Sequence, residues 1–158
     1  SSTAIAQRTQ SLDEDPQRKH VVDRVLALLK RAGQSAALRE GTAALTRLGK
    51  RSCWSDALGL FEGIRSGRVA ADVPLWNSLL SALDKGRQPH LALQILENMR
   101  CHALEPNVTT YSTAISASEK DQEWHVAIAL LQDMIRYSLH ANVVAYSAAI
   151  GACSKSGQ

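Results

Sequence analysis

The chain has 158 residues, of which 45% are hydrophobic and 21% are charged, and its formal net charge is +3. This length and apolar content suit a folded domain with a core and argue against a disordered chain. The net charge is compatible with an anionic partner but is too small to identify one. The longest uninterrupted apolar run, residues 126–131, is far too short to cross a bilayer, so no membrane partner is expected.

The N-terminal part of the chain is set apart from the rest. Residues 1–14 are polar and aperiodic, which predicts a mobile arm. Asp15 and Pro16 then supply a helix N-cap and a proline at the first helical position, and Gly33 closes the helix. Residues 15–37 do not align with later segments, and we expect a leading helix region that caps the remainder of the chain.

From residue 38 onward the sequence repeats with a step of 35 residues. A fixed period of this size predicts stacked copies of one supersecondary unit. The units succeed one another without a gap, at 38–72, 73–107 and 108–142, with a partial unit at 143–158. The step relates Trp76, Tyr111 and Tyr146, and it relates Lys50, Lys85, Lys120 and Lys155.

Each complete unit divides into two helices of about three turns. In the unit 73–107, apolar residues mark a first helix from Trp76 to Leu83 and a second from Leu91 to Met99. The segment 85–89 turns the chain between them. The small residues Ala92 and Ala127 would let paired helices approach closely. No strand alternation of useful length occurs, so we expect an all-α fold, an α-solenoid of helix-turn-helix repeats.

The chemistry of catalysis or metal binding is not evident in the sequence. Cys53, Cys101 and Cys153 are odd in number and widely spaced, which predicts buried reduced thiols and no disulfide or zinc site. The sequence has no phosphate-cradling glycine loop, no HExxH motif and no convincing pair of carboxylates. We therefore expect no catalytic residue, no metal, no cofactor and no enzymatic activity.

Three runs resemble the pentatricopeptide repeat (PPR) family. Residues 108–117 (VTTYSTAISA) and 143–153 (VVAYSAAIGAC) look like the start of such a repeat. Residues 99–107 (MRCHALEPN) resemble its closing turn, in which a proline leads into Asp or Asn. The tetratricopeptide pattern Trp-x-x-Leu-Gly-x-x-Tyr is absent. The resemblance covers residues 38–158, and the first unit departs from it at Gly41 and Ala71.

The resemblance implies a function as well as a fold. Proteins of this family form right-handed superhelices and bind single-stranded RNA, one base per repeat, read by two or three side chains. They act in organellar RNA processing, stability or translation, which implies a mitochondrion or a plastid, although no targeting segment is identifiable in the sequence. Because the sequence ends within a repeat, we expect it to be part of a longer repeat array.

The resemblance also implies which residues contact RNA. The base selectors are the residue after the aromatic position and the last residue of each unit, and a further residue brackets the base, where Arg39 of the first unit departs from the family. One lysine per unit is the candidate phosphate contact. The base selectors are Thr42 with Asp72, Asn77 with Asn107, Ser112 with Asn142, and Ser147; the bracketing residues are Pro74, Thr109 and Val144; the phosphate contacts are Lys50, Lys85, Lys120 and Lys155.

The pairing rules of the family imply guanine for the first unit, cytosine with uracil tolerated for the second, and adenine for the third. Asp72 is acceptor-only, which suits the N–H donors of guanine. For adenine, we expect Ser112 to donate and Asn142 to accept. Two amides in the second unit would satisfy either pyrimidine, so poor discrimination is expected there.

Other interpretations stay open at the level of sequence. The periodic lysines also suit helix-end cations that interact with the helix dipole. Asn107 and Asn142 also suit turn residues with no role in base readout. The alternative function is a helical-repeat scaffold whose groove binds a protein or peptide partner.

Overall fold

The computed structural model describes residues 20, 23–25, 27–28, 31, 33–66 and 70–157. The predicted arm at 1–14 and the predicted helix start at 15–16 lie outside these ranges. The described residues form helices and turns and contain no strand, which confirms the expected all-α class. The helices are α3 (Gln34–Lys50), α4 (Trp54–Ser66), α5 (Val73–Lys85), α6 (Pro89–Cys101), α7 (Val108–Lys120), α8 (Trp124–Arg136) and α9 (Val143–Lys155).

The helices reproduce the period of the sequence. The starts of α4, α6 and α8 are 35 residues apart, as are those of α5, α7 and α9, and each of these helices has 13 residues. Helix α3 is longer than these helices: it has 17 residues and begins at Gln34, ahead of the repeat start at residue 38. The repeated sequence therefore forms repeated helical hairpins, and the longer helix α3 belongs to the first of them.

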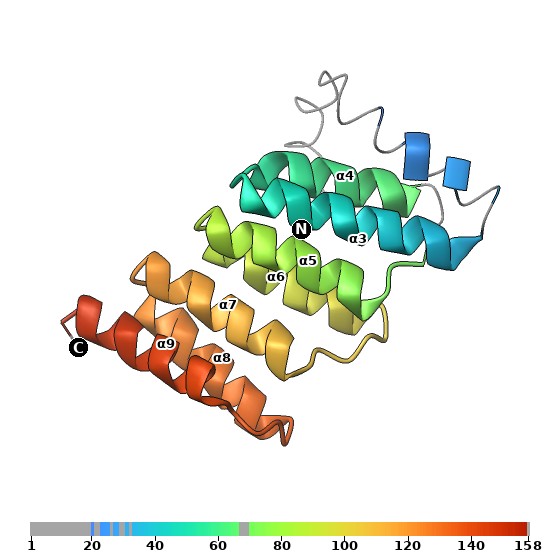
Figure 1. The fold of residues 1–158 in the computed structure, drawn as a ribbon. Coiled ribbons are helices and arrows are strands. Elements are labelled where there is room, and N and C mark those ends of the chain that lie inside the picture. The colour runs from blue at the N-terminus through green and yellow to red at the C-terminus, as the bar shows by residue number, and fades with distance from the viewer. Residues whose placement is uncertain are drawn as a thin grey trace. The chain divides into compact units, whose positions relative to one another are not determined.

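The chain divides into two compact units, residues 1–82 and 83–158, so the division falls inside α5. In the first unit, α3 packs against α4. In the second unit, α7 contacts α6, α8 and α9, and α8 contacts α9 (Figure 1). Within the described part of the chain, no helix combines the length and the apolar character needed to span a membrane.

The turn after each first helix uses a residue with a left-handed backbone. Ser52, Arg87 and Gln122 have φ of 55°, 53° and 61°, and Gly157 has φ of 74° at the same place in the period. Only Gly157 is a glycine, the residue type that adopts this conformation without steric strain. The turns at Ser52, Arg87 and Gln122 are therefore strained relative to a glycine turn.

Small residues set the distances between helices. Ala57, Ala92 and Ala127 are fully buried. Gly41 is also buried, and a Cβ there would lie 2.9 Å from Ile64 Cδ1 and 3.2 Å from Leu75 Cδ1. Close packing at Gly41 explains why the first unit has no aromatic residue at this position of its repeat.

The aromatic position is buried in the next two units and exposed in the last. Trp76 and Tyr111 are 1% exposed, and the Trp76 ring meets Phe61 edge-on at 4.5 Å. Tyr146 in α9 is 46% exposed, and no described helix comes after α9 to cover it.

The cysteines are free, but the expectation that they are buried is wrong. Cys53 and Cys153 are half-buried and Cys101 is exposed. Cys53 directly precedes α4, Cys101 ends α6 and Cys153 lies in the last turn of α9. Sequence composition favours burial of free thiols, but position at a helix end decided the outcome here.

Candidate functional site

The last residue of each complete unit caps the next helix. The side-chain oxygen Oδ1 accepts the backbone N–H three residues later in all three cases: from Leu75 to Asp72 at 3.0 Å, from Thr110 to Asn107 at 3.0 Å, and from Ala145 to Asn142 at 2.9 Å. These caps satisfy N–H groups that have no partner inside the helix. One predicted selector per unit therefore has a structural task, which leaves only its remaining polar group for a ligand.

The third pair of predicted selectors is brought together. Ser112 Oγ lies 3.1 Å from Asn142 Oδ1 and 2.7 Å from the carbonyl oxygen of Val108. The serine is only 6% exposed, whereas Asn142 is exposed. The acceptor oxygen of Asn142 is thus occupied by the cap and by Ser112. Within the described residues, the amide N–H₂ group of Asn142 makes no hydrogen bond, so this exposed amide is a donor.

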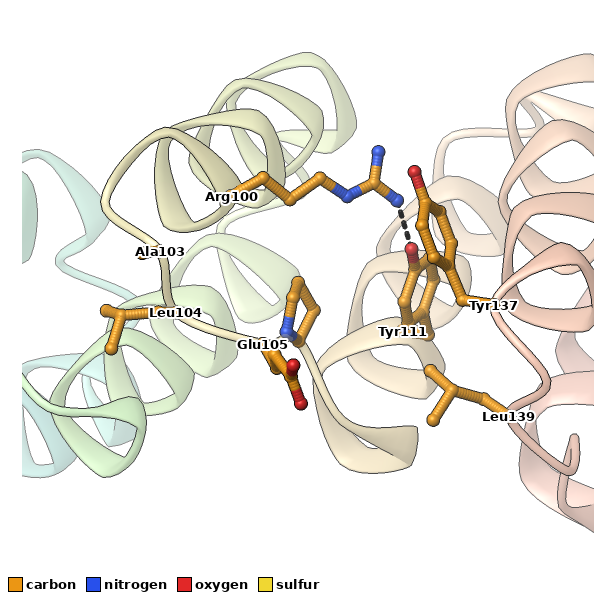
Figure 2. A pocket seen from close by; sticks show the side chains of 8 residues that line it. Arg100, Ala103, Leu104, Glu105, Tyr111, Tyr137 and Leu139 are labelled. Atoms are coloured by element: carbon orange, nitrogen blue, oxygen red, sulfur yellow. Dashed lines mark hydrogen bonds between the residues drawn. The ribbon is translucent and has the colours of Figure 1, made fainter.

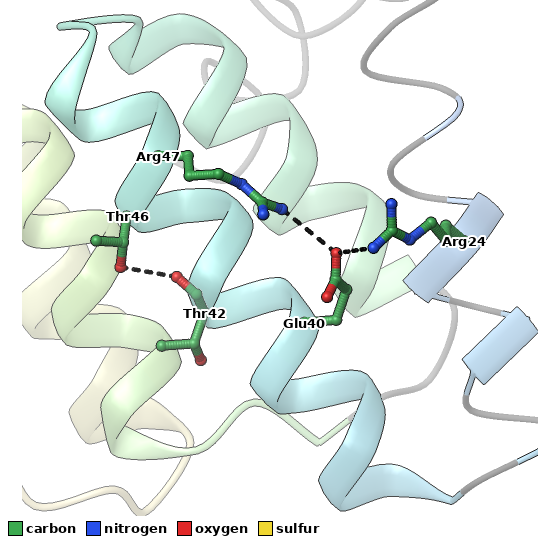
Figure 3. A network of polar contacts seen from close by, with 5 residues as sticks. All are labelled: Arg24, Glu40, Thr42, Thr46 and Arg47. Atoms are coloured by element: carbon green, nitrogen blue, oxygen red, sulfur yellow. Dashed lines mark hydrogen bonds and ion pairs between the residues drawn. The ribbon is translucent and has the colours of Figure 1, made fainter.

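The first pair is less closely connected. Thr42 is half-buried in α3, and its carbonyl oxygen accepts a hydrogen bond of 2.8 Å from the Thr46 hydroxyl (Figure 3). Beside it, Glu40 forms ion pairs with Arg24 at 2.8 Å and Arg47 at 3.3 Å. Among the described residues no hydrogen bond joins the side chains of Thr42 and Asp72.

The other predicted base contacts lie where helices begin. Pro74, Thr109 and Val144 are exposed residues in the first turn of α5, α7 and α9. Asn77 is half-buried in α5, and Ser147 is exposed in α9. Asn107 is exposed, and its Oδ1 also accepts a hydrogen bond of 3.0 Å from the Thr110 hydroxyl.

Each predicted phosphate lysine is the last residue of a first helix: Lys50 ends α3, Lys85 ends α5, Lys120 ends α7 and Lys155 ends α9. Each stands eight residues after a selector, or about 12 Å along the axis at 1.5 Å per residue. Two of the four are ion-paired, Lys120 with Asp84 at 2.6 Å and Lys155 with Glu119 at 2.9 Å. Lys50 and Lys85 form no ion pair with another described residue.

A second polar site was not predicted from the sequence. It is a cavity of about 470 Å³ between the end of α6, the loop after it, the start of α7 and the end of α8 (Figure 2). The Arg100 guanidinium lies 4.5 Å from the Tyr137 ring centroid, donates to the Tyr111 hydroxyl and lies 3.5 Å from Asp133. The cavity is lined by Arg100, Ala103, Leu104, Glu105, Pro106, Tyr111, Tyr137 and Leu139.

Two groups in this cavity have shifted pKa values. Burial raises the pKa of Tyr111, and the hydrogen bond from Arg100 offsets this only in part, so the net shift is upward. Burial lowers the pKa of Arg100, but the hydrogen bond to Tyr111 and the nearby Tyr111, Tyr137 and Asp133 outweigh it, and its pKa is raised. The sequence carried one signal for this contact, since Arg65 and Trp76 stand one period before Arg100 and Tyr111. In both units the guanidinium carbon lies 5.8 Å from the ring centroid.

Metal chemistry has no support in the described ranges, where no three His, Cys, Asp or Glu side chains gather to hold an ion. The candidate site therefore consists of polar and apolar side chains repeated at 35-residue intervals, some exposed and some partly buried, with a lysine at the end of each first helix.

Comparison with known proteins finds a family match for part of the repeated region. The PPR repeat family matches residues 71–120, which span α5, α6 and α7. No curated protein sequence matches the chain.

Solved structures share the fold. The pentatricopeptide repeat protein PPR10 in complex with an 18-nt psaJ RNA element superposes with a TM-score of 0.70 and 27% identity, over 89% of this chain and 21% of that chain. PPR10 from maize gives a TM-score of 0.68 and 20% identity, over 96% of this chain and 24% of that chain, which bears on the fold alone. The chain thus spans about a fifth to a quarter of the length of the proteins it matches.

Proposed function

We propose that this chain, which carries repeats of the pentatricopeptide family, binds single-stranded RNA and reads it with one base per repeat. The observation that carries the proposal is the recurrence of a capping Asp or Asn at the last position of each unit. The cap holds the side chain in one orientation, so the remaining polar group is presented at the same place in every repeat. The RNA-bound PPR10 structure, with the same fold, supports the choice of ligand.

The capping bond determines what each selector can offer. Asn142 uses its oxygen for Ala145 and Ser112, so it presents amide N–H donors to a base. Asp72 uses one carboxylate oxygen for Leu75, so it presents an acceptor. The amide donor of Asn142 suits adenine N1, and the second carboxylate oxygen of Asp72, as an acceptor, suits the N–H groups of guanine.

These roles replace the expectation for the third unit that Ser112 donates to the base and Asn142 accepts from it. Ser112 is buried, and its hydroxyl can donate to the carbonyl oxygen of Val108 or to Asn142 Oδ1. We propose that this contact orients the Asn142 amide. The proposed reading is guanine at Thr42 with Asp72, cytosine or uracil at Asn77 with Asn107, and adenine at Ser112 with Asn142. Ser147 would be the first base selector of a fourth unit.

The remaining contacts would hold the strand. Pro74, Thr109 and Val144 are exposed at helix starts and would bracket bases, and the lysines would contact phosphates. Base stacking in single-strand binders contributes about 1–3 kcal/mol per base, so three units offer about 3–9 kcal/mol before ordering costs. We therefore expect dissociation constants in the millimolar to micromolar range for this chain.

The decisive experiment is a titration of labelled RNAs that contain 5′-GCA-3′ against RNAs with the same bases scrambled, each at two salt concentrations. We expect tighter binding to GCA at both salt concentrations. Equal affinity for all sequences would contradict base readout, and absence of RNA binding at low salt would contradict the proposed function.

A second candidate function is binding of a protein or peptide partner. The observation that favours it is the cavity at Arg100, whose apolar wall of Leu104, Pro106 and Leu139 would accept an apolar side chain. If this is the function, Leu104→Ser would abolish partner capture and leave RNA binding unchanged. The PPR match favours RNA as the first candidate.

We extend the proposal to location, since a role in organellar RNA processing, stability or translation would place the whole protein in a mitochondrion or plastid. Microscopy of the full protein with a fluorescent tag would test this location, and a signal confined to the cytosol or the nucleus would contradict it.

A further inference from the structure

Carboxylates accompany the periodic lysines in an ordered way. The Lys120 ammonium at the end of α7 lies 2.6 Å from Asp84 near the end of α5, and the Lys155 ammonium at the end of α9 lies 2.9 Å from Glu119 near the end of α7. In both cases the two residues are 36 positions apart. Each lysine of one repeat thus pairs with the carboxylate just before the lysine of the preceding repeat.

The space around the two carboxylates of these pairs is limited. Glu119 is one methylene longer than Asp84, and the helix facing it carries Gly151, where a Cβ would lie 2.5 Å from Glu119 Oε1. One period earlier the same sequence position is Ser116. The Asp84 side chain is 13% exposed, and its Oδ1 accepts no hydrogen bond within the described residues. Lys120 is therefore the partner that compensates a largely buried carboxylate.

Lys85 stands apart from this arrangement. The residue one period before Asp84 is Gly49, which has no side chain to pair with a lysine. Lys85 is exposed and forms no ion pair in the described part of the chain. The repeats thus differ in the charge that they display at the same position, with a full positive charge at Lys85 and neutral pairs at Lys120 and Lys155.

We propose that Asp84 and Glu119 weaken the phosphate contacts of Lys120 and Lys155, so that Lys85 is the strongest phosphate contact in residues 83–157. This inference rests on the proposed RNA binding and deepens it. A phosphate that approaches Lys120 must share the ammonium with Asp84 and is repelled by that carboxylate. Removing the carboxylate charge frees the lysine for one further phosphate contact.

The test measures RNA affinity by fluorescence anisotropy at several salt concentrations, with labelled RNA containing 5′-GCA-3′. Asp84→Asn and Glu119→Gln are each expected to tighten binding about two- to fivefold at low salt. Each is also expected to steepen the dependence of log affinity on log salt concentration by about 0.7, the change expected for one further phosphate contact. Glu97→Gln, an exposed acid on α6, makes the same change in net charge and is the matched control.

A double-mutant comparison separates the contributions of Lys85 and Lys120 to RNA affinity. Lys85→Gln is expected to weaken binding more than Lys120→Gln in the unmodified chain. In the Asp84→Asn background, Lys120→Gln is expected to weaken binding about as much as Lys85→Gln does. Circular dichroism melting curves of each variant check that the fold is retained.

Two outcomes oppose the inference and are distinguishable. If the unmodified chain binds RNA but Asp84→Asn and Glu119→Gln match Glu97→Gln, the carboxylates do not control the lysines and the inference is wrong. If no variant binds RNA at low salt, the proposed function itself is wrong and the inference falls with it.

Discussion

Asn142 caps a helix and, under the proposed function, would contact a base through a different atom. Its oxygen caps α9, and its exposed amide N–H₂ group is left for a ligand. Asp72 caps α5 in the same way, which shows that a carboxylate fulfils the same structural task. An exchange of Asn for Asp at this position therefore replaces an amide donor by a carboxylate acceptor and keeps the helix cap.

The first prediction concerns this division of tasks. Asn142→Asp should keep the stability of the chain, because Asp and Asn are similarly good N-caps. It should move the preference of the third unit from adenine to guanine, because an acceptor replaces the donor. Competition between 5′-GCA-3′ and 5′-GCG-3′ RNAs measures the preference.

The control variant for this swap is Asn142→Ala, which removes both the cap and the proposed base contact. It should lower the free energy of unfolding by about 1 kcal/mol and abolish discrimination at the third base. An unchanged preference for adenine in Asn142→Asp would show that the register of the reading is misplaced.

The second prediction concerns the left-handed turn residues. Arg87→Gly and Gln122→Gly remove steric strain at φ of 53° and 61° and should each raise the free energy of unfolding by about 0.5–1 kcal/mol. Gln132→Gly, at an exposed position inside α8, should lower it by about 1 kcal/mol. Urea denaturation of the three variants checks the opposite signs, and destabilisation by Arg87→Gly and Gln122→Gly would refute the strain argument.

At the scale of helices, the third prediction concerns the contact of α6 with α7. The pKa of Tyr111 lies above its ordinary value of 10.0, so the folded chain favours the protonated phenol. Above pH 10 the unfolded chain loses this proton first, and stability is lost as pH rises through the folded pKa. Tyr111→Phe should therefore show a smaller loss of stability above pH 10.

Thermal melts between pH 8 and pH 11 measure this slope, with Tyr146→Phe as the control at an exposed tyrosine of α9. Tyr111→Phe should also lower stability at pH 8, because it leaves Arg100 without one acceptor. Parallel pH profiles for the unmodified chain and Tyr111→Phe would contradict the assignment.

The fourth prediction concerns the close packing of α8. Ala127 is fully buried, whereas Gln132 on the same helix is exposed. Ala127→Glu would bury a charge and should lower the free energy of unfolding by more than about 3 kcal/mol. Gln132→Glu makes the same charge change and should stay within about 0.5 kcal/mol. Denaturant titration compares the two, and similar values for both would contradict close packing.

Helix bounds were largely predictable, because each first and second helix keeps to the 35-residue period of the sequence. The exception is α3, which is longer and starts at Gln34. The aromatic position of the first unit is Gly41 because Ile64 and Leu75 approach it closely. The sequence showed the departure at Gly41, but only packing showed its cause.

At the scale of the whole molecule, the fifth prediction is the salt dependence of RNA binding. Four lysines in equal contact with phosphates would give a log–log slope of about 2.8, at about 0.7 per phosphate in single strands. If Lys120 and Lys155 are held by carboxylates, the slope should approach about 1.4. Anisotropy titrations between 20 and 200 mM salt, roughly the range in which phosphate contacts dominate, distinguish the two values, and a slope near the larger one would show that the carboxylates have no effect.

The sequence by itself determined the repeat, the all-α class, the helix register and the recurrence of Asp or Asn at the unit ends. The repeat period can be read directly from the order of the residues, and helix formation depends on the spacing of apolar residues that are close together in the sequence. Only the tertiary structure decided which atoms those residues leave free, that Ser112 is buried, and that Arg100 and the tyrosines enclose a cavity. It also decided that Lys120 and Lys155 meet carboxylates 36 residues away, because such contacts depend on side-chain length and on the distance between packed helices.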